Sequence, residues 1–595
     1  MESVPRYIEE NGERLRSRYL AFIHDLGEAE ICGKPVVDHL DIGDDFSYWW
    51  MTHLAEKSPF KSPGIYSCMR LLALEEILRE RNPADLTFHS PDGKEAEAVR
   101  ILCRNLGIAY SWHKTGVTGP NWSLRRLYRL LPHFVRALII FAMHLATRWR
   151  LRRVRLPNWS GGHKAIFMCS YFIHLDPILC AQGQFHSRQW EVLPQYLNEK
   201  GWRANWIQHF LTSKVVPDVG TGLSWLEKFN ADPDRQGRHC FLDCYLTWHV
   251  VWRTLKDWLR LVWRSWQLRQ IQEYFRPRDS RCSFWPILRD EWRSSIGGTV
   301  AIGNCLWVAL FDSVMSRMPR QGLGLYLCEN QGWERAFLHA WRRHGHGRII
   351  AVPHATVPFW HLYYFDDARS LASRNRCGMP QPDVLAVNGA MARRAFTEAG
   401  YPSSKMVDVE ALRYMKLTTS DKNPHTRKMA MPPLGKVNVL ILGELLPASM
   451  NRLLELVQAA AKNLPDGYQF TFKPHPGYSV DLSNFANLEA KQTTEALDLI
   501  LQDYDVAISA NSTSAAVDAY ISGLPVIVGL DGSDLNLSPL RGQTDVSFVG
   551  TPDELVSALL KVKESTPQNF GKGDIFFLDE KLPRWSSLLQ KYGAQ

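Results

Sequence analysis

Short apolar runs alternate with amphipathic stretches along most of the chain, a pattern typical of parallel strands joined by helices. In the first half, strand-like runs occupy the segments 163–177, 202–210, 322–330, 347–355, 382–389 and 405–412. Helical patterns occupy the segments 187–201, 332–345 and 390–400 between them. A longer amphipathic pattern with five tryptophans covers 248–275, and we expect most of these rings to fill the core or an interface.

The same alternation starts again after a polar, proline-bearing stretch at 418–435, which has the composition of a linker. Strand-like runs then lie at 436–447, 468–476, 504–511 and 524–530, with helical patterns at 448–463, 493–502 and 512–523, and the segment 547–565 continues the unit. The chain is therefore predicted to be an α/β protein with two Rossmann-like parallel-sheet domains facing a cleft.

The predicted boundaries divide the chain into six parts. An N-terminal α/β region (1–117) contains a helix and two strands, and a basic amphipathic helical segment (118–160) follows it. The two sheet domains are 161–417 and 436–572, joined by the linker 418–435. The tail 573–595 is expected to return to the first half.

The composition and the cysteine spacing indicate where in the cell the protein is located. The 595 residues are 45% hydrophobic and 22% charged, which is ordinary for a folded protein of several domains. The eleven cysteines show no metal-binding spacing, and the first twenty residues are charged where a signal peptide would be apolar. These features predict a cytoplasmic protein.

The formal net charge of +9 is concentrated in one segment. Arg125 to Arg155 contains nine arginines and no acidic residue, around an apolar run too short to span a bilayer. Such a segment favours a helix in the headgroup region, and hence a protein peripheral to the inner membrane. A basic helix packed on the protein's own core is the alternative, and nucleic-acid binding is a third reading that we disfavour.

Polar residues follow two strand-like runs in the second domain, where open α/β sheets bind ligands. Lys473, His475 and Pro476 end one run, so that an ammonium and an imidazole could hold a phosphate on a rigid turn. The other run ends in hydroxyl and amide side chains at a helix start: Ser509, Asn511, Ser512, Thr513 and Ser514. We expect these two loops to follow neighbouring strands and together to hold a phosphate. The alternative for the first loop is a rigid surface turn, and for the second it is simple helix capping.

Other nucleotide-binding signatures are missing from the sequence. It contains no GxxxxGK[ST] motif and no GxGxxG at a strand-to-helix turn. ATPase, kinase and dinucleotide-enzyme interpretations therefore lose their main support.

The segments "FKPHP" and "SANSTSAAVDAYISGLPVIV" resemble the nucleotide-binding motifs of bacterial sialyltransferases and Kdo transferases of the GT-B class. The segments "SYWWMTHLAEKSPFKSP", "SYFIHLD", "CENQGWERAFLHAW" and "VEALRY" resemble bacterial surface-carbohydrate biosynthesis proteins related to retaining β-Kdo transferases. The resemblance implies a GT-B fold and a CMP-activated ulosonic acid as the donor. It implies no metal and no cofactor, because the two loops could neutralise the leaving phosphate.

Transfer from such a donor needs a carboxylate, as a nucleophile in a retaining reaction or as a base in an inverting one. The candidates interrupt apolar runs of the first half: Asp243, Asp176 and Glu329. We favour Asp243 as the nucleophile, because a lone buried carboxylate is costly without a purpose, although backbone hydrogen bonding could also explain it. His354 and Arg413 are candidates for binding the donor's carboxylate or phosphate, and Lys57 and Lys61 for meeting an anionic acceptor.

The sequence thus predicts a glycosyltransferase that moves a Kdo-like or sialic-acid-like sugar to a surface glycan or glycolipid. Transfer from CDP-glycerol or an NDP-hexose is an alternative within the same class. A non-catalytic scaffold of polysaccharide assembly is the alternative outside it.

Overall fold

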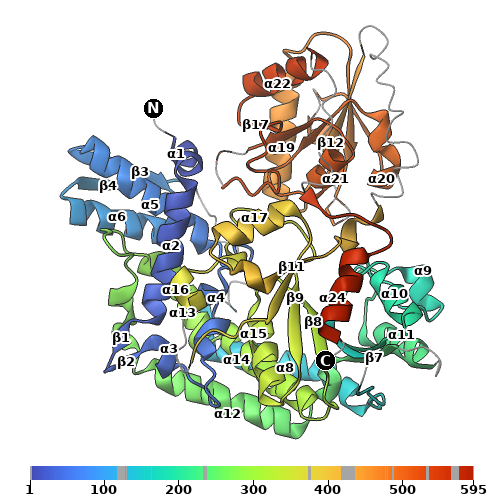
Figure 1. Cartoon of the computed structure of the whole chain (residues 1–595). Coiled ribbons are helices and arrows are strands. Elements are labelled where there is room, and N and C mark those ends of the chain that lie inside the picture. Colours follow the sequence, from blue (N-terminus) through green and yellow to red (C-terminus); the bar gives the residue numbers. More distant parts are fainter. Residues whose placement is uncertain are drawn as a thin grey trace.

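The computed structural model describes residues 3–116, 128, 130–162, 164–231, 237–372, 377–416, 436–475, 477–478, 480–485, 488–530, 532, 535–564 and 575–593. Two parallel sheets dominate it, one of seven and one of six strands, which confirms the predicted α/β architecture. In Figure 1 the smaller sheet and its helices form the upper lobe, and the larger sheet lies below. The linker 418–435 lies outside the described residues.

The first sheet has the strand order β11-β10-β9-β8-β5-β6-β7, and every pair is parallel. Its strands are β5 (Ala165–Phe172), β6 (Arg203–Phe210), β7 (Gly237–Phe241), β8 (Leu323–Leu327), β9 (Arg348–Val352), β10 (Val384–Val387) and β11 (Met406–Asp408). Alternate residues face opposite cores, as in β5, where Ile166 and Phe167 belong to different clusters. The continuous apolar runs read from the sequence reflect this burial on both faces.

Helices cover both faces of this sheet. On one face lie α2 (Gly12–Gly27), α8 (His133–Arg148), α12 (Trp248–Ser265), α13 (Trp285–Gly297), α14 (Thr299–Met315), α15 (Gly332–Arg343), α16 (Ala368–Ala372) and α17 (Ala390–Glu398). Short helices α9 (Pro177–Ala181), α10 (Leu193–Glu199) and α11 (Val219–Ala231) follow β5 and β6. By length and apolar composition, Trp285–Met315 could cross a membrane, but 67% of its most apolar window is buried, as in a core helix.

The second sheet has the order β14-β13-β12-β15-β16-β17, again with all pairs parallel. Its strands are β12 (Val437–Leu442), β13 (Tyr468–Lys473), β14 (Ala490–Gln492), β15 (Val506–Ser509), β16 (Val526–Gly529) and β17 (Ser547–Val549). Its helices are α19 (Pro447–Ala461), α20 (Leu497–Ile500), α21 (Ala515–Ile521) and α22 (Pro552–Glu564).

The N-terminal region packs onto the first domain instead of forming a core of its own. It contains α1 (Val4–Glu10), α3 (Val36–His39), α4 (His53–Glu56), α5 (Gly64–Arg81), α6 (Gly93–Leu106) and the short parallel pair β3 (Asp85–Ser90) and β4 (Ala109–Lys114). A small hairpin pairs β1 (Glu30–Ile31) with β2 (Lys34–Pro35). Buried residues of α2 and α5 belong to the same cluster as those of α12–α14.

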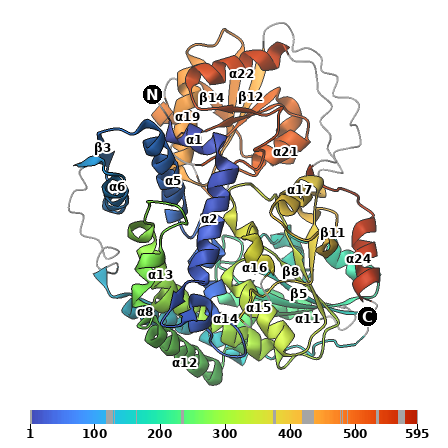
Figure 2. The same ribbon diagram turned by 60° about the vertical axis from the view of Figure 1, so that its left-hand side comes forward.

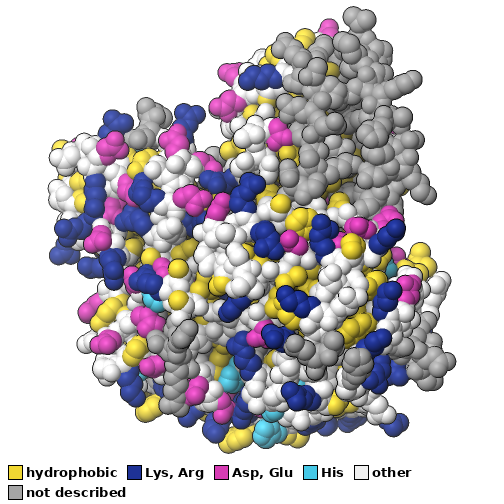
Figure 3. Space-filling model, in the orientation of Figure 1, with side chains coloured by type: hydrophobic (Ala, Val, Ile, Leu, Met, Phe, Trp, Pro, Cys, Tyr) yellow, Lys and Arg dark blue, Asp and Glu magenta, His cyan; other side chains and the backbone are white. Residues whose placement is uncertain are grey.

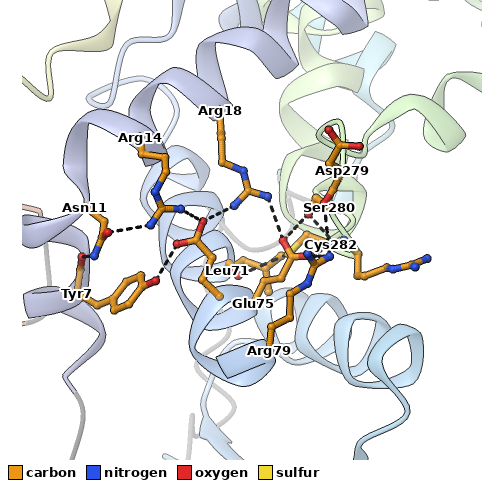
Figure 4. Close-up of polar contacts among 12 residues, drawn as sticks. Tyr7, Asn11, Arg14, Arg18, Leu71, Glu75, Arg79, Asp279, Ser280 and Cys282 are labelled. Carbon is orange, nitrogen blue, oxygen red and sulfur yellow. Dashed lines mark hydrogen bonds and ion pairs between the residues drawn. The ribbon is translucent and has the colours of Figure 1, made fainter. Parts of the chain in front are cut away.

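A buried carboxylate helps to hold the N-terminal helices against the loop before α13 (Figure 4). Glu75 on α5 pairs with Arg79 at 2.7 Å and with Arg18 of α2 at 3.3 Å. It also accepts hydrogen bonds of 2.6 Å from the Ser280 hydroxyl and from the backbone N–H of Arg281. Only 1% of its side chain is exposed. Although burial opposes ionisation, these donors and cations leave the pKa of Glu75 below its usual value.

The tail returns to the first half as α24 (Pro583–Gly593). Its buried Trp585 and Leu588 pack with α10 and with the inner strands of the first sheet (Figure 1). On the way, Phe576 stacks on Tyr414, the last aromatic residue before the linker, with ring centroids 3.9 Å apart. The departing and returning stretches of chain therefore touch one another.

Candidate functional site

Four polar residues follow four strands of the first sheet at one edge. His174, Glu329, His354 and Arg413 come after β5, β8, β9 and β11 respectively. Because the strands are parallel, their carboxyl ends meet at this edge, and β5, β8 and β9 are consecutive in the sheet. The structure thus brings together Glu329, His354 and Arg413, three of the residues singled out in the sequence, and adds His174.

Glu329 and His354 form the centre of this cluster. His354 Nε2 lies 3.8 Å from Glu329 Oε1, and the Gln331 side-chain amide donates to Glu329 Oε2. Burial raises the pKa of Glu329, against the lowering effects of Gln331, Lys61 and Arg413. Burial, with help from Arg413 and His174, lowers the pKa of His354 to about 3. At neutral pH the imidazole is therefore uncharged, and the carboxyl is better suited to exchanging a proton than an exposed one.

Arg413 links the cluster to the second domain. It lies on the turn Leu412–Tyr414 (η7), whose Tyr414 packs with Leu440 and Ala516 of the second domain. Across this contact, burial raises the pKa of Asp518 on α21 to about 6, and the Arg413 guanidinium acts in the opposite direction. The carboxyl edge of the first sheet therefore faces the start of α21, below the upper lobe of Figure 1.

Lys473 and His475 lie at the end of β13. The Lys473 ammonium donates to the carbonyl of Glu495. The backbone N–H of Gly477 donates to His475 Nδ1 at 3.0 Å, so a neutral ring carries its proton on Nε2 and can donate it to an anion. Burial lowers the pKa of both side chains. Pro476 lies outside the described residues.

The polar side chains of the loop after β15 differ in their hydrogen bonding: some are engaged in holding the loop, and others could meet a ligand. Asn511 donates to the carbonyl of Leu535 at 2.7 Å and accepts from the backbone N–H of Leu537 at 3.0 Å, which accounts for its amide. Thr513 is buried and accepts a hydrogen bond from a nearby backbone N–H. Ser514 is exposed at the start of the seven-residue α21, and Ser509 is fully buried with no partner for its hydroxyl.

A buried carboxylate that the sequence analysis missed separates the two loops. The prediction that the loops follow neighbouring strands is wrong, because β12 lies between β13 and β15. Its end carries Glu444, which accepts hydrogen bonds from the hydroxyls of Ser512 and Ser449 and is 3% exposed. Beside it, a Cβ on Gly443 would lie 2.6 Å from the backbone nitrogen of His475. The signal in the sequence that could have revealed this carboxylate is the position of Glu444, two residues after the apolar run 437–442.

Two of the predicted catalytic carboxylates have other partners. Asp176 caps α9, where one oxygen accepts from the backbone N–H groups of Ile178 and Leu179 at 2.9 Å each. These bonds, led by that from Leu179, lower its pKa, as expected for a capping role.

Asp243 follows β7, the edge strand farthest from β11. Its Oδ1 lies 2.9 Å from Nε2 of His144 on α8. Three strand spacings separate β7 from β8, about 14 Å, so the structure does not bring Asp243 to Glu329.

Lys57 and Lys61, the two lysines expected to meet an anionic acceptor, differ in their exposure to solvent. Lys57 is buried and pairs with Asp366 at 2.7 Å. Lys61 is one-third exposed, pairs with Glu56 at 2.6 Å and donates to Gln331 at 3.0 Å, which brings it beside Glu329. Only Lys61 therefore remains close to the cluster with an exposed side chain.

No family model and no curated protein matches the sequence. Among solved structures, similarity was found to the lipopolysaccharide outer core galactosyltransferase WaaB, with a TM-score of 0.37 and 10% identity over 72% of this chain and 99% of that one. A UDP-GlcNAc 2-epimerase of Methanocaldococcus jannaschii gives a TM-score of 0.36 and 11% identity over 72% and 99%. The calicheamicin glycosyltransferase CalG4 gives 0.34 and 11% over 68% and 92%. Scores this low carry no argument about activity, so the description of the fold rests on the two sheets themselves.

Proposed function

We propose that the protein is a glycosyltransferase whose donor lies between the Glu329–His354–Arg413 cluster and the Lys473–His475 turn. The observation that supports the proposal is the approach of two carboxyl sheet edges. One carries a carboxyl group whose pKa is raised by burial, and the other an imidazole whose proton lies on Nε2. Transfer of a sugar from a nucleotide needs both functions, one for the acceptor hydroxyl and one for the leaving phosphate.

In this proposal the donor is a CMP-linked ulosonic acid, as the motif resemblance implies. Lys473, His475 and the hydroxyl of Ser514 would receive the phosphate. Glu444, which accepts a hydrogen bond from the Ser512 hydroxyl, would accept further hydrogen bonds from the ribose hydroxyls through its remaining lone pairs. Arg413 would pair with the sugar carboxylate in the bidentate manner that guanidinium groups favour.

Glu329 is proposed as the group that exchanges a proton with the acceptor hydroxyl, in place of the sequence-based preference for Asp243. Its raised pKa and its position opposite the second domain favour this role. Glu329 alone would suffice as the base of an inverting reaction, whereas a retaining route would need a second carboxylate near the sugar. The acceptor would be a surface glycan or glycolipid, reached by a cytoplasmic protein held at the inner membrane through Arg125–Arg155.

The test is a donor panel. The purified protein should release CMP from CMP-Kdo or CMP-sialic acid, and should leave CDP-glycerol and UDP-sugars intact. Cleavage of CDP-glycerol or of a UDP-sugar alone would replace the proposed donor with one of the alternatives. No cleavage, together with a melting temperature that CMP does not change, would favour the scaffold.

A further inference from the structure

Helix α12 presents a row of large apolar side chains to solvent. Four tryptophans and a leucine form this row, which we call the aromatic stripe: Trp248 (70% exposed), Trp252 (70%), Leu259 (58%), Trp263 (63%) and Trp266 (65%). Of the five tryptophans in the predicted helical pattern, only Trp258 is buried. Of the core or interface positions expected for these rings, the core is excluded for the four exposed ones, and an interface role remains for them.

The spacing of the stripe explains this exposure. Its members recur every three, four or seven residues, which places them on one side of an α-helix. The other side carries the buried Val250, Thr254 and Leu261 and packs against the apolar α14. The amphipathic pattern of α12 thus has an apolar inner side and a second apolar row facing outward.

Helix α8 extends the exposed apolar surface. It also packs on α14, through Ala137 and Phe141, and exposes Phe134, Leu138 and Met143 by 52%, 43% and 57%. The two helices meet where Trp149, just after α8, contacts Trp248 with ring centroids 4.7 Å apart. Both lie at the bottom of the molecule in Figures 1 and 2, opposite the second domain.

The charges around this surface are basic. Arg150, Arg152, Arg153 and Arg155 are exposed just after α8, and the guanidinium of Arg152 lies 4.6 Å from the Trp149 ring centroid. The segment 130–162 contains no acidic residue, and the single acid of α12, Asp257, is buried beside Arg253. Along the lower edge of Figure 3, hydrophobic and basic side chains lie among histidine and some acidic side chains.

We propose that the faces of α8 and α12 dock on a lipid bilayer whose headgroups are anionic. Tryptophan is enriched at membrane interfaces, where its ring is buried and its N–H remains hydrated, and each nearby arginine adds attraction to anionic lipid. A second copy of the chain would bring the same arginines close to themselves, and this repulsion favours lipid over self-association. The sequence analysis assigned only Arg125–Arg155 to the membrane, so the aromatic stripe is a new site.

This surface does not depend on the transferase proposal, because lipid binding is measured without turnover. It also fixes an orientation: the first domain lies on the bilayer and the second domain points away from it (Figure 2).

The experiment is flotation of the purified full-length protein with phosphatidylcholine vesicles that contain or lack phosphatidylglycerol. We expect flotation with the anionic vesicles and weaker flotation with the neutral ones. Replacing the four exposed tryptophans together, Trp248→Ser, Trp252→Ser, Trp263→Ser and Trp266→Ser, should lower partitioning into anionic vesicles by about tenfold or more. Replacing Arg150, Arg152 and Arg153 by Gln should remove most of the preference for anionic vesicles.

A matched control removes exposed apolar groups elsewhere. Ile178→Ser with Leu499→Ser changes side chains that are 69% and 71% exposed, and flotation should stay at the level of the unchanged protein. Unchanged melting temperatures verify that the variants fold. The proposal is overturned if the four-tryptophan variant floats like the unchanged protein, or if the unchanged protein does not float. A dimer that the tryptophan replacements dissociate, without effect on flotation, would instead assign the stripe to self-association.

Discussion

Glu329 acquires its proposed role from its surroundings, since burial raises its pKa against the lowering effects of Gln331, Lys61 and Arg413. Replacing it by Gln keeps the size and the hydrogen bond to Gln331 but removes the proton acceptor. We expect kcat to fall by about 10²- to 10⁴-fold while CMP still raises the melting temperature.

The pH dependence of turnover tests the proposed role of Glu329 independently. If Glu329 acts as the base, kcat/KM should rise with pH through a pKa above the ordinary glutamate value of 4.5. Asp243→Asn is the comparison: full loss of turnover in that variant and near-normal turnover in Glu329→Gln would return the role to Asp243.

Lys473 offers a test of the donor side. Replacing it by Ala removes an ammonium at the end of β13, and the dissociation constant of CMP should rise by about ten- to a hundredfold. Lys491→Ala, an exposed lysine on β14 of the same sheet, is the matched control and should bind CMP normally. Equal affinities of the two variants in calorimetry would remove Lys473 from the phosphate site.

Glu75 contributes to stability and not to the site. Glu75→Gln removes the counter-charge of Arg79 and weakens the hydrogen bonds from Ser280 and from the Arg281 N–H. Arg18 keeps its ion pair with Glu76, so we expect a loss of about 1–3 kcal/mol in unfolding free energy. Because the folded-state pKa lies below the unfolded value, the stabilisation is present above pH 4.5 and is lost as pH falls through the folded pKa. Denaturation of the variant should therefore depend less on pH in the acidic range, and an unchanged acid transition would contradict this.

The sequence indicated which polar residues follow strands. It did not indicate which of these residues lie close together in the folded protein. Glu329, His354 and Arg413 could be placed at one edge because parallel strands end together. Asp243 shares that edge in principle, and only the strand order, which is not encoded locally, shows that it lies at the far end. Glu444 was overlooked because its importance depends on the insertion of β12 between β13 and β15.

At the scale of elements, buried strands were the easiest to recognise, because burial on both faces leaves continuous apolar runs. Helices α13 and α14 were not anticipated: α14 is apolar on nearly all sides and so lacks the periodicity that marks an amphipathic helix. Strand β14 (Ala-Lys-Gln) is a largely exposed edge strand and so has no apolar run in the sequence.

Helix α24 should be required for the stability of the first domain, although it comes last in the sequence. Trp585 is fully buried, and its Nε1 donates to the carbonyl of Glu410 at 2.9 Å. Trp585→Ala should cost about 3–5 kcal/mol and lower the melting temperature clearly. Trp112→Ala, at a ring that is 41% exposed, should have a small effect, and equal effects would argue against a structural role for the returning helix.

At the scale of the whole molecule, α1 ties the second domain to the first. Glu9 pairs with Arg541 at 2.9 Å and accepts from the indole of Trp360 at 3.4 Å. Glu9→Gln should weaken this tie and increase the radius of gyration in small-angle X-ray scattering. Glu10→Gln, at an exposed neighbour, is the control, and identical scattering of the two variants would show that the tie is dispensable.

The stacked pair Tyr414–Phe576 has a mechanical consequence. Since the outgoing and incoming chain touch there, both covalent connections between the two sheet domains lie at one place, and a change in the angle between the domains would be taken up there. A change that separates α1 from the second domain would also have to break the ion pair between Glu9 and Arg541.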